Sequence, residues 1–181
     1  MKQDLREELE IPQGITVAVQ DGVFTVKGSK GELKRSMKSP TISFSVTGSN
    51  IIFESKKATQ REKKMIKSDI AHLKYMMKGV ENAHVYKLKV CASHFPMNVT
   101  VKGAVLEIKN FIGETVSRTI NIPKGVSIKV DGQILVVESI DKELAGQTAA
   151  RVELRTKRPG FDKRIFQDGI YLIEKDGKPI K

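Results

Sequence analysis

The chain has 181 residues, of which 39% are hydrophobic, so it can form one ordinary domain or two small ones with a real core. Its 32 lysines and arginines outnumber 21 aspartates and glutamates, and the resulting formal charge of +11 favours a polyanionic partner. Its apolar runs are far shorter than the roughly 20 residues of a membrane-spanning helix, and its charged N-terminus lacks the apolar core of a secretory signal. We therefore expect a cytoplasmic protein without a membrane partner.

The first half of the chain reads mainly as strands. Residues 15–19 and 23–27 alternate apolar and polar positions on either side of Asp21 and Gly22, which predicts a hairpin. A second turn is expected between Gly28 and Gly31, and we prefer it to a phosphate-binding loop because strands, and not a helix, flank it. Residues 42–46 and 51–55 then predict another strand pair.

A helix is predicted to begin after Thr59, because Thr59 and Glu62 have the spacing of a capping box. Apolar residues then recur at helical spacing along one face, and they are Ile66, Ile70, Leu73 and Met77. Gly79 stands where a left-handed C-terminal cap is expected. The lysines on the other face are interpreted as solvated surface in preference to a primary contact.

The second half repeats the first. After a strand predicted around residues 85–92, identities recur in the same order at offsets of 84, 82 and again 84; Ser43 and Ser55, for example, match Ser127 and Ser139. The expected fold class is α+β, a tandem duplication of two similar small domains, each a mainly antiparallel sheet with one packed helix. We expect the domains to span residues 1–82 and 83–181.

The second helix is predicted from about Asp141 to Leu154, and the chain beyond it has no counterpart in the first half. Residues 163–166 and 170–173 predict short strands, and this C-terminal extension is expected to pair with the second sheet. The tail after residue 175 is expected to fray.

Positive charge is concentrated between the second helix and the final strands. Six basic residues stand against Glu153 and Asp162, and they are Arg151, Arg155, Lys157, Arg158, Lys163 and Arg164. Guanidinium groups can bind phosphate oxygens two at a time, so we expect this segment to bind nucleic acid. Phe161 and Phe166 could pack in the core or stack on an unpaired base.

Other chemistry finds little support in the sequence. Cys91 is the single cysteine, so no intrachain disulfide can form, and Cys91 with His94 lacks the second pair of ligands that a structural zinc site needs. A nucleophile beside a base, or paired carboxylates, cannot be picked out by spacing. We expect no metal, no cofactor and no enzymatic activity.

Several motifs resemble those of a known family, the large-subunit ribosomal protein numbered six, in its archaeal and eukaryotic branch. They lie at residues 86–90, 93–96, 146–150 and, most specifically, 164–172. The resemblance implies two tandem α+β domains and binding to large-subunit rRNA, mainly through the C-terminal domain, near the sarcin-ricin loop. Translational GTPases would dock nearby, and other large-subunit ribosomal proteins would be neighbours.

By motif, the resemblance assigns RNA contacts to Lys157, Lys163, Arg164, Gln167, Asp168 and Gly169, and charge adds Arg151, Arg155 and Arg158. The competing class is a non-ribosomal, β-rich protein-interaction scaffold that presents sheet edges to partners and uses its basic charge only for solubility. The two classes differ in salt dependence, because binding to phosphates releases counterions and weakens steeply as salt rises.

Overall fold

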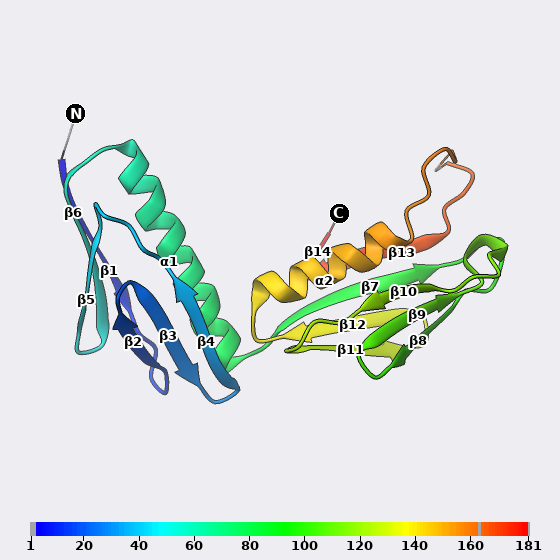
Figure 1. Ribbon diagram of the computed structural model, residues 1–181, viewed down its shortest axis with the longest axis horizontal. Coiled ribbons are helices and arrows are strands. Elements are labelled where there is room, and N and C mark those ends of the chain that lie inside the picture. The colour runs from blue at the N-terminus through cyan, green and yellow to red at the C-terminus, as the bar shows by residue number, and fades with distance from the viewer. Residues whose placement is uncertain (1–2, 163, 181) are drawn as a thin grey trace. The chain divides into compact units, whose positions relative to one another are not determined.

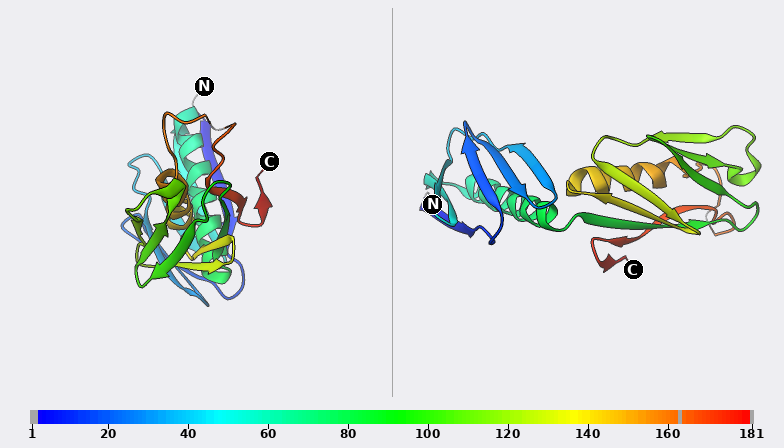
Figure 2. Two further views of the ribbon diagram at one scale, coloured as in Figure 1. Left: turned by 90° about the vertical axis from the view of Figure 1, so that its right-hand side faces the viewer. Right: turned by 90° about the horizontal axis from the view of Figure 1, so that it is seen from below.

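The computed structural model describes residues 3–162 and 164–180 (Figures 1 and 2). The chain divides between Ala83 and His84 into two compact units. In the described ranges each unit contains one α-helix and two antiparallel sheets, which confirms a tandem α+β duplication. Neither helix combines the length and the apolarity that a bilayer span requires.

The first unit builds its core between the helix α1 and two three-stranded sheets. One sheet has the order β1-β6-β5, and its strands are Gln3–Glu10, Asn50–Ala58 and Ser43–Thr47. The other has the order β2-β3-β4, and its strands are Thr16–Gln20, Val23–Gly28 and Gly31–Ser36. Phe24 stacks on Phe53 with ring centroids 6.4 Å apart, and Phe44 meets both rings edge-on. Both hairpin turns expected in this region are present.

Helix α1 spans Gln60–Glu81 and begins as predicted. The Thr59 side chain accepts a hydrogen bond from the N-terminal turn, and Glu62 accepts one from the backbone N–H of Thr59 at 2.8 Å. The expected cap at Gly79 is wrong, because the helix continues and Gly79 is buried inside it. Val80, which is fully buried, continues the apolar face and packs on Gly28, so contacts with the sheet extend the helix past the glycine.

The second unit repeats this plan and adds to it. Its larger sheet has the order β11-β12-β7-β13-β14, with strands Val126–Asp131, Ile134–Ser139, His84–Cys91, Gly169–Lys175 and Lys178–Pro179. Its smaller sheet has the order β10-β9-β8, with strands Arg118–Asn121, Val105–Lys109 and Asn98–Lys102, and a short 3-10 turn, η1, spans Phe111–Gly113. Helix α2 spans Lys142–Arg155 and buries Ala145, Thr148, Ala149 and Val152. The extension pairs with the sheet as expected, because β13 lies antiparallel to β7.

Three further features differ from the sequence-based expectations. Strand β1 was not predicted, and it pairs with β6 although it carries five charged side chains. Residues 164–166 form a turn and coil instead of a strand, and Lys163 lies outside the described residues. The tail from 176 to 180 is not frayed: it turns back at Gly177 and pairs as β14, and the Ile180 N–H bonds to the Ile173 carbonyl oxygen at 2.9 Å. Strand β1 depends on a partner distant in sequence, whereas the turn at 164–166 and the hairpin of the tail are closed by hydrogen bonds between residues at most seven positions apart.

Candidate nucleic-acid interface

The basic segment is a loop tied at both ends to the fold. Thr156 ends α2, and its hydroxyl donates to the Glu153 carbonyl oxygen at 3.0 Å. The same hydroxyl oxygen accepts the backbone N–H of Ile170, in β13, at 3.0 Å. Thr156 is buried, so one threonine joins the residues that open and close the loop. Residues 157–168 therefore leave and re-enter the domain at fixed points.

Asp168 makes the second anchor of this loop. Its carboxylate accepts the backbone N–H groups of Ser93 and His94 at 2.5 and 3.2 Å, and it also accepts the Ser93 hydroxyl and the ring Nδ1 of His94 at 3.1 and 2.5 Å. Burial alone would raise the pKa of Asp168, but these hydrogen bonds outweigh it and lower the pKa to about 2. The carboxylate therefore stays ionised and ties the loop to the chain that follows β7.

Aromatic rings and an arginine line the loop in a continuous series. The Arg158 guanidinium lies 4.2 Å from the centre of the Phe161 ring, and Phe161 meets Phe166 edge-on at 4.8 Å. Phe166 in turn stacks on His94 at 5.1 Å. Both phenylalanines are thus held by neighbouring rings, while Phe161 keeps 36% of its surface accessible.

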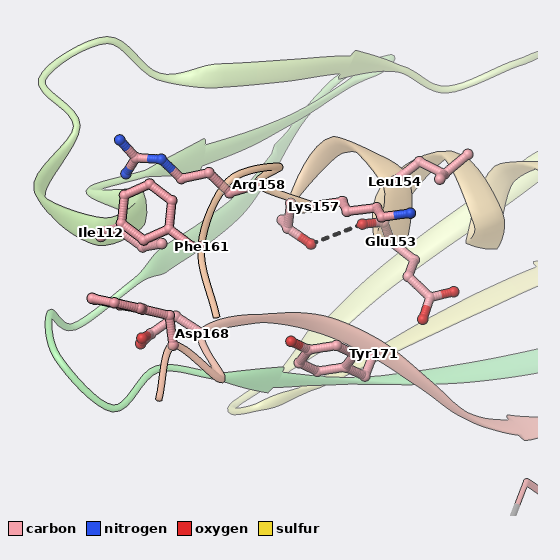
Figure 3. A pocket seen from close by; sticks show the side chains of 10 residues that line it. Ile112, Glu153, Leu154, Lys157, Arg158, Phe161, Asp168 and Tyr171 are labelled. Atoms are coloured by element: carbon pink, nitrogen blue, oxygen red, sulfur yellow. Dashed lines mark hydrogen bonds between the residues drawn. The ribbon is translucent and has the colours of Figure 1, made fainter. Parts of the chain in front are cut away.

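Beside these rings lies a cavity of about 260 Å³ (Figure 3). Its walls combine apolar side chains with charged ones of both signs, and they include Ile112, Leu154 and Tyr171, the cations Lys157 and Arg158, and the carboxylates of Glu153 and Asp168. In Figure 3 the Arg158 guanidinium extends over Phe161, and Leu154 and Tyr171 lie on the other side of the cavity. Leu154 is exposed, and burial raises the pKa of the Tyr171 hydroxyl, which keeps it a neutral donor. The cavity thus offers apolar surface, charged groups of both signs and a hydroxyl together.

Arg118 is a component of this region that sequence reasoning missed. Its guanidinium forks onto the Glu114 carboxylate at 2.6 and 2.8 Å, lies 4.3 Å from the centre of the Phe111 ring, and donates to the Arg155 carbonyl oxygen at 2.5 Å. The hydrogen bonds from Arg118 lower the pKa of Glu114, and Arg158 and Arg155 add to the effect. Arg118 therefore holds the C-terminal end of α2 against the smaller sheet. Charge density could not have found it, because it lies outside the basic run.

The predicted contact residues fall into three groups. Arg151, Arg155, Lys157, Arg164 and Gln167 are exposed, and Arg158 is half-buried. Asp168 and Gly169 are buried, the first in the anchor described above and the second in β13 opposite Cys91. Lys163 lies outside the described residues. The structure thus places cations on the surface, while the motif Asp168-Gly169 shapes the loop from inside.

Arg164 is exposed but already has a partner. Its side chain binds both carboxylate oxygens of Asp162, with Nη2 at 2.9 Å from Oδ2 and Nε at 3.2 Å from Oδ1. This contact lowers the pKa of Asp162 and raises that of Arg164. Any anion that binds Arg164 must therefore share it with Asp162 or replace that carboxylate.

In comparison with known proteins, one family model matches the chain twice, once in each half. The family model described as Ribosomal protein L6 matches residues 11–83 and residues 95–169. Large ribosomal subunit protein uL6 of Methanococcus vannielii is 41% identical over 176 residues, which cover 97% of both chains. Large ribosomal subunit protein uL6 of Methanosarcina mazei is 38% identical over 175 residues, which cover 97% of this chain and 99% of the relative.

Proposed function

Because the chain belongs to the ribosomal protein L6 family, we propose that it binds large-subunit rRNA, chiefly through the unit that follows Ala83. It is a structural protein of the large ribosomal subunit and not an enzyme. Its partners are rRNA and other ribosomal proteins, so the non-ribosomal scaffold is no longer a competing interpretation. The contact we propose lies near the sarcin-ricin loop and the docking site of translational GTPases.

One observation carries the proposal: the loop that follows Thr156 is anchored at both ends, and basic residues lie on it and on the last turns of α2. Thr156 and Asp168 fix its ends, so the backbone that carries the basic side chains loses little additional freedom when RNA binds. Arg151 and Arg155 are four residues apart on α2 and share one face, which leads into Lys157 and Arg158. This arrangement suits the phosphates of a folded RNA, which is recognised mainly by shape and backbone.

Within this site the two buried motif residues act as positioning groups. The Asp168 carboxylate already accepts four hydrogen bonds, so we assign it to holding the loop and not to touching RNA. A Cβ added at Gly169 would lie 3.1 Å from the Tyr171 ring, which explains a need for glycine by close packing. Phe161 is the ring available to stack on an unpaired base, because Phe166 is enclosed between Phe161 and His94.

The salt dependence of RNA binding tests this site. The probe is a large-subunit rRNA fragment that carries the sarcin-ricin loop, and the variant is Arg155→Ala with Lys157→Ala. Each phosphate contact contributes about 0.9 to the slope of log affinity against log salt on duplex DNA, so the double variant should lower the slope by about 1 to 2. The matched control is Lys63→Ala with Lys64→Ala, which removes two exposed charges from α1. Equal slopes for both double variants would contradict the proposal.

A further inference from the structure

Strands β1 and β7 occupy the same position in the two units. Leu9 of β1 lies opposite Ile51, and Leu88 of β7 lies opposite Leu135, which follows Ile51 by the 84-residue repeat. The Ile11 N–H donates to the Ser49 carbonyl oxygen at 2.7 Å, and the Val90 N–H donates to the Gln133 carbonyl oxygen at 2.8 Å. The two acceptor residues, Ser49 and Gln133, are again 84 positions apart, and the two donor residues, Ile11 and Val90, are 79 positions apart. Residue by residue, β1 therefore corresponds to β7 with an offset of 79.

The outer edges of the two strands differ. Strand β13 pairs with β7 along the edge away from β12, and the Asp176 N–H donates to the Val85 carbonyl oxygen at 2.8 Å. In the first unit, β1 ends its sheet, and the part of the chain that the structure describes supplies no strand beyond it. The second unit thus shows what covers this edge, and the first unit leaves the same edge open.

The pairing of β1 with β6 determines which residues of β1 direct their backbone N–H and C=O groups toward the open edge. Residues of an antiparallel pair alternate between those that bond to the partner and those that point away. The Ile11 N–H bonds toward β6, so the alternate residues Leu9 and Glu7 also direct their backbone groups toward β6. The residues between them, Arg6, Glu8 and Glu10, direct theirs outward. Arg6 corresponds to Val85, whose carbonyl bonds to Asp176 in the second unit. The corresponding residues of β1 and β7 therefore direct their backbone groups to the same side of the strand.

A hollow of about 480 Å³ lies between β1 and α1. Leu9, Pro12 and Met77 are its apolar lining residues. Charged residues of both signs also line it: Glu8 and Glu10 of β1, and Lys74, Lys78 and Glu81 of α1. In the second unit β13 lies beside β7 in the sheet and also contacts α2, and its Ile170 is fully buried. The first unit thus offers both an unpaired strand edge and apolar space beside it.

Charge indicates which kind of strand fits. Across the covered edge, the Lys87 ammonium of β7 binds Glu174 of β13 at 3.0 Å. At the offset of 79, the position of Lys87 is taken by Glu8 and that of Lys89 by Glu10, so the sign of the edge is reversed. Strand β1 carries four acidic residues and one basic residue in a chain of net charge +11. Such an edge repels RNA phosphates and attracts a basic polypeptide.

We propose that β1 binds an extended basic segment of another protein, which adds to the sheet as an antiparallel strand. Its backbone pairs with Arg6, Glu8 and Glu10, its inward side chains are apolar and enter the hollow, and a lysine or arginine faces Glu8. Strand addition of this kind gains affinity from main-chain hydrogen bonds and specificity from alternate side chains. The site goes beyond the proposed rRNA contact and does not depend on it, because it uses residues of the first unit alone.

Hydrogen exchange of the purified chain and of the chain in assembled large subunits tests the proposal. The amides of Arg6, Glu8 and Glu10 should exchange at least ~10-fold more slowly in the particle, while the Glu7 amide, bonded within the sheet, serves as the internal reference. A photoreactive residue at Glu10 should attach to a lysine- or arginine-rich segment of one other protein. Unchanged exchange at the three outward amides would overturn the proposal, and so would attachment only to rRNA or to a second copy of this chain.

A pair of variants separates backbone pairing from side-chain charge. Glu8→Pro removes an outward N–H that the sheet itself does not use, so the purified chain should keep protected amides in β6. In particles this variant should lose the protection at Arg6 and Glu10. The matched variant Glu8→Ala keeps the N–H and should retain most of the protection at Arg6 and Glu10. Equal protection in both variants would contradict an added strand, and the rRNA site in the other unit provides an independent check that the particle is intact.

Discussion

Ser55 and Ser139 make the same hydrogen bond in the two units. The Ser55 hydroxyl donates to the Thr41 carbonyl oxygen at 2.9 Å, and the Ser139 hydroxyl donates to the Gly125 carbonyl oxygen at 2.8 Å. Donors and acceptors both differ by 84 in number, and both serines are buried. The repeat thus preserves an individual side-chain contact beyond the order of the strands.

Removing either hydroxyl should destabilise its own unit. The loss should be larger for Ser139, because its hydroxyl oxygen also accepts the backbone N–H of Asp141 at 3.2 Å. Ser55→Ala and Ser139→Ala each leave a carbonyl without its partner, which costs about 1 to 2 kcal/mol. Native-state hydrogen exchange, which reports each unit separately, measures the effect. Ser43→Ala is the control, because the Ser43 hydroxyl also bonds to a carbonyl but is exposed, and it should cost less than about 0.5 kcal/mol. A loss in both units from one substitution would contradict the prediction.

Asp168 should make the stability of the second unit depend on acid. Its pKa is about 2 in the folded chain and about 4 when unfolded, so its contribution is fully present above pH 4 and is lost as the pH falls toward 2. Asp168→Asn should therefore lower the free energy of unfolding by about 2 kcal/mol at pH 7, and the difference from the parent chain should shrink near pH 2. Denaturant titrations at several pH values measure this. Asp131→Asn, at an exposed position, is the control, and an equal deficit at pH 7 and pH 2 would contradict the assignment.

Two glycines with ordinary φ angles should respond to alanine in opposite ways. A Cβ at Gly28 would lie 2.7 Å from the Val80 side chain and 2.9 Å from its carbonyl oxygen, so Gly28→Ala must displace α1 and should cost about 2 kcal/mol or more. A Cβ at Gly146 would lie 3.4 Å from the Tyr86 hydroxyl, within ordinary contact. Gly146 lies inside α2, so Gly146→Ala should be neutral or stabilise by up to about 1 kcal/mol. Thermal unfolding measures both, and a stabilising Gly28→Ala would disprove the close packing.

Asp162 should restrain RNA binding by occupying Arg164. Asp162→Asn leaves a neutral side chain and releases the guanidinium, so affinity for the sarcin-ricin fragment should rise by ~3- to 10-fold at low salt. Asp131→Asn changes the net charge equally at an exposed position outside the loop and controls for long-range attraction. If both variants bind equally tightly in a filter or fluorescence assay, Arg164 is not a direct contact.

The sequence by itself determined the duplication, the α+β class and the elements with strong local signals. Thr59 and Glu62 specify the start of α1, and Asp21 with Gly22 specifies a hairpin, because both signals depend on atoms a few residues apart. The concentration of cations after α2 was equally visible, since charge density is a local property. These features need no knowledge of distant contacts.

Only the tertiary structure decided the rest, because the deciding partners are far apart in the chain. Strand β1 exists through pairing with β6, some 45 residues away, despite its charged side chains. Asp168 reads as a surface residue in sequence, yet its carboxylate is enclosed by Ser93 and His94, 75 and 74 residues earlier. The difference between the covered edge of β7 and the open edge of β1 is likewise a matter of pairing. Hydrogen bonds between distant segments, which no local pattern encodes, therefore set both the shape of the basic loop and the place left open for a partner.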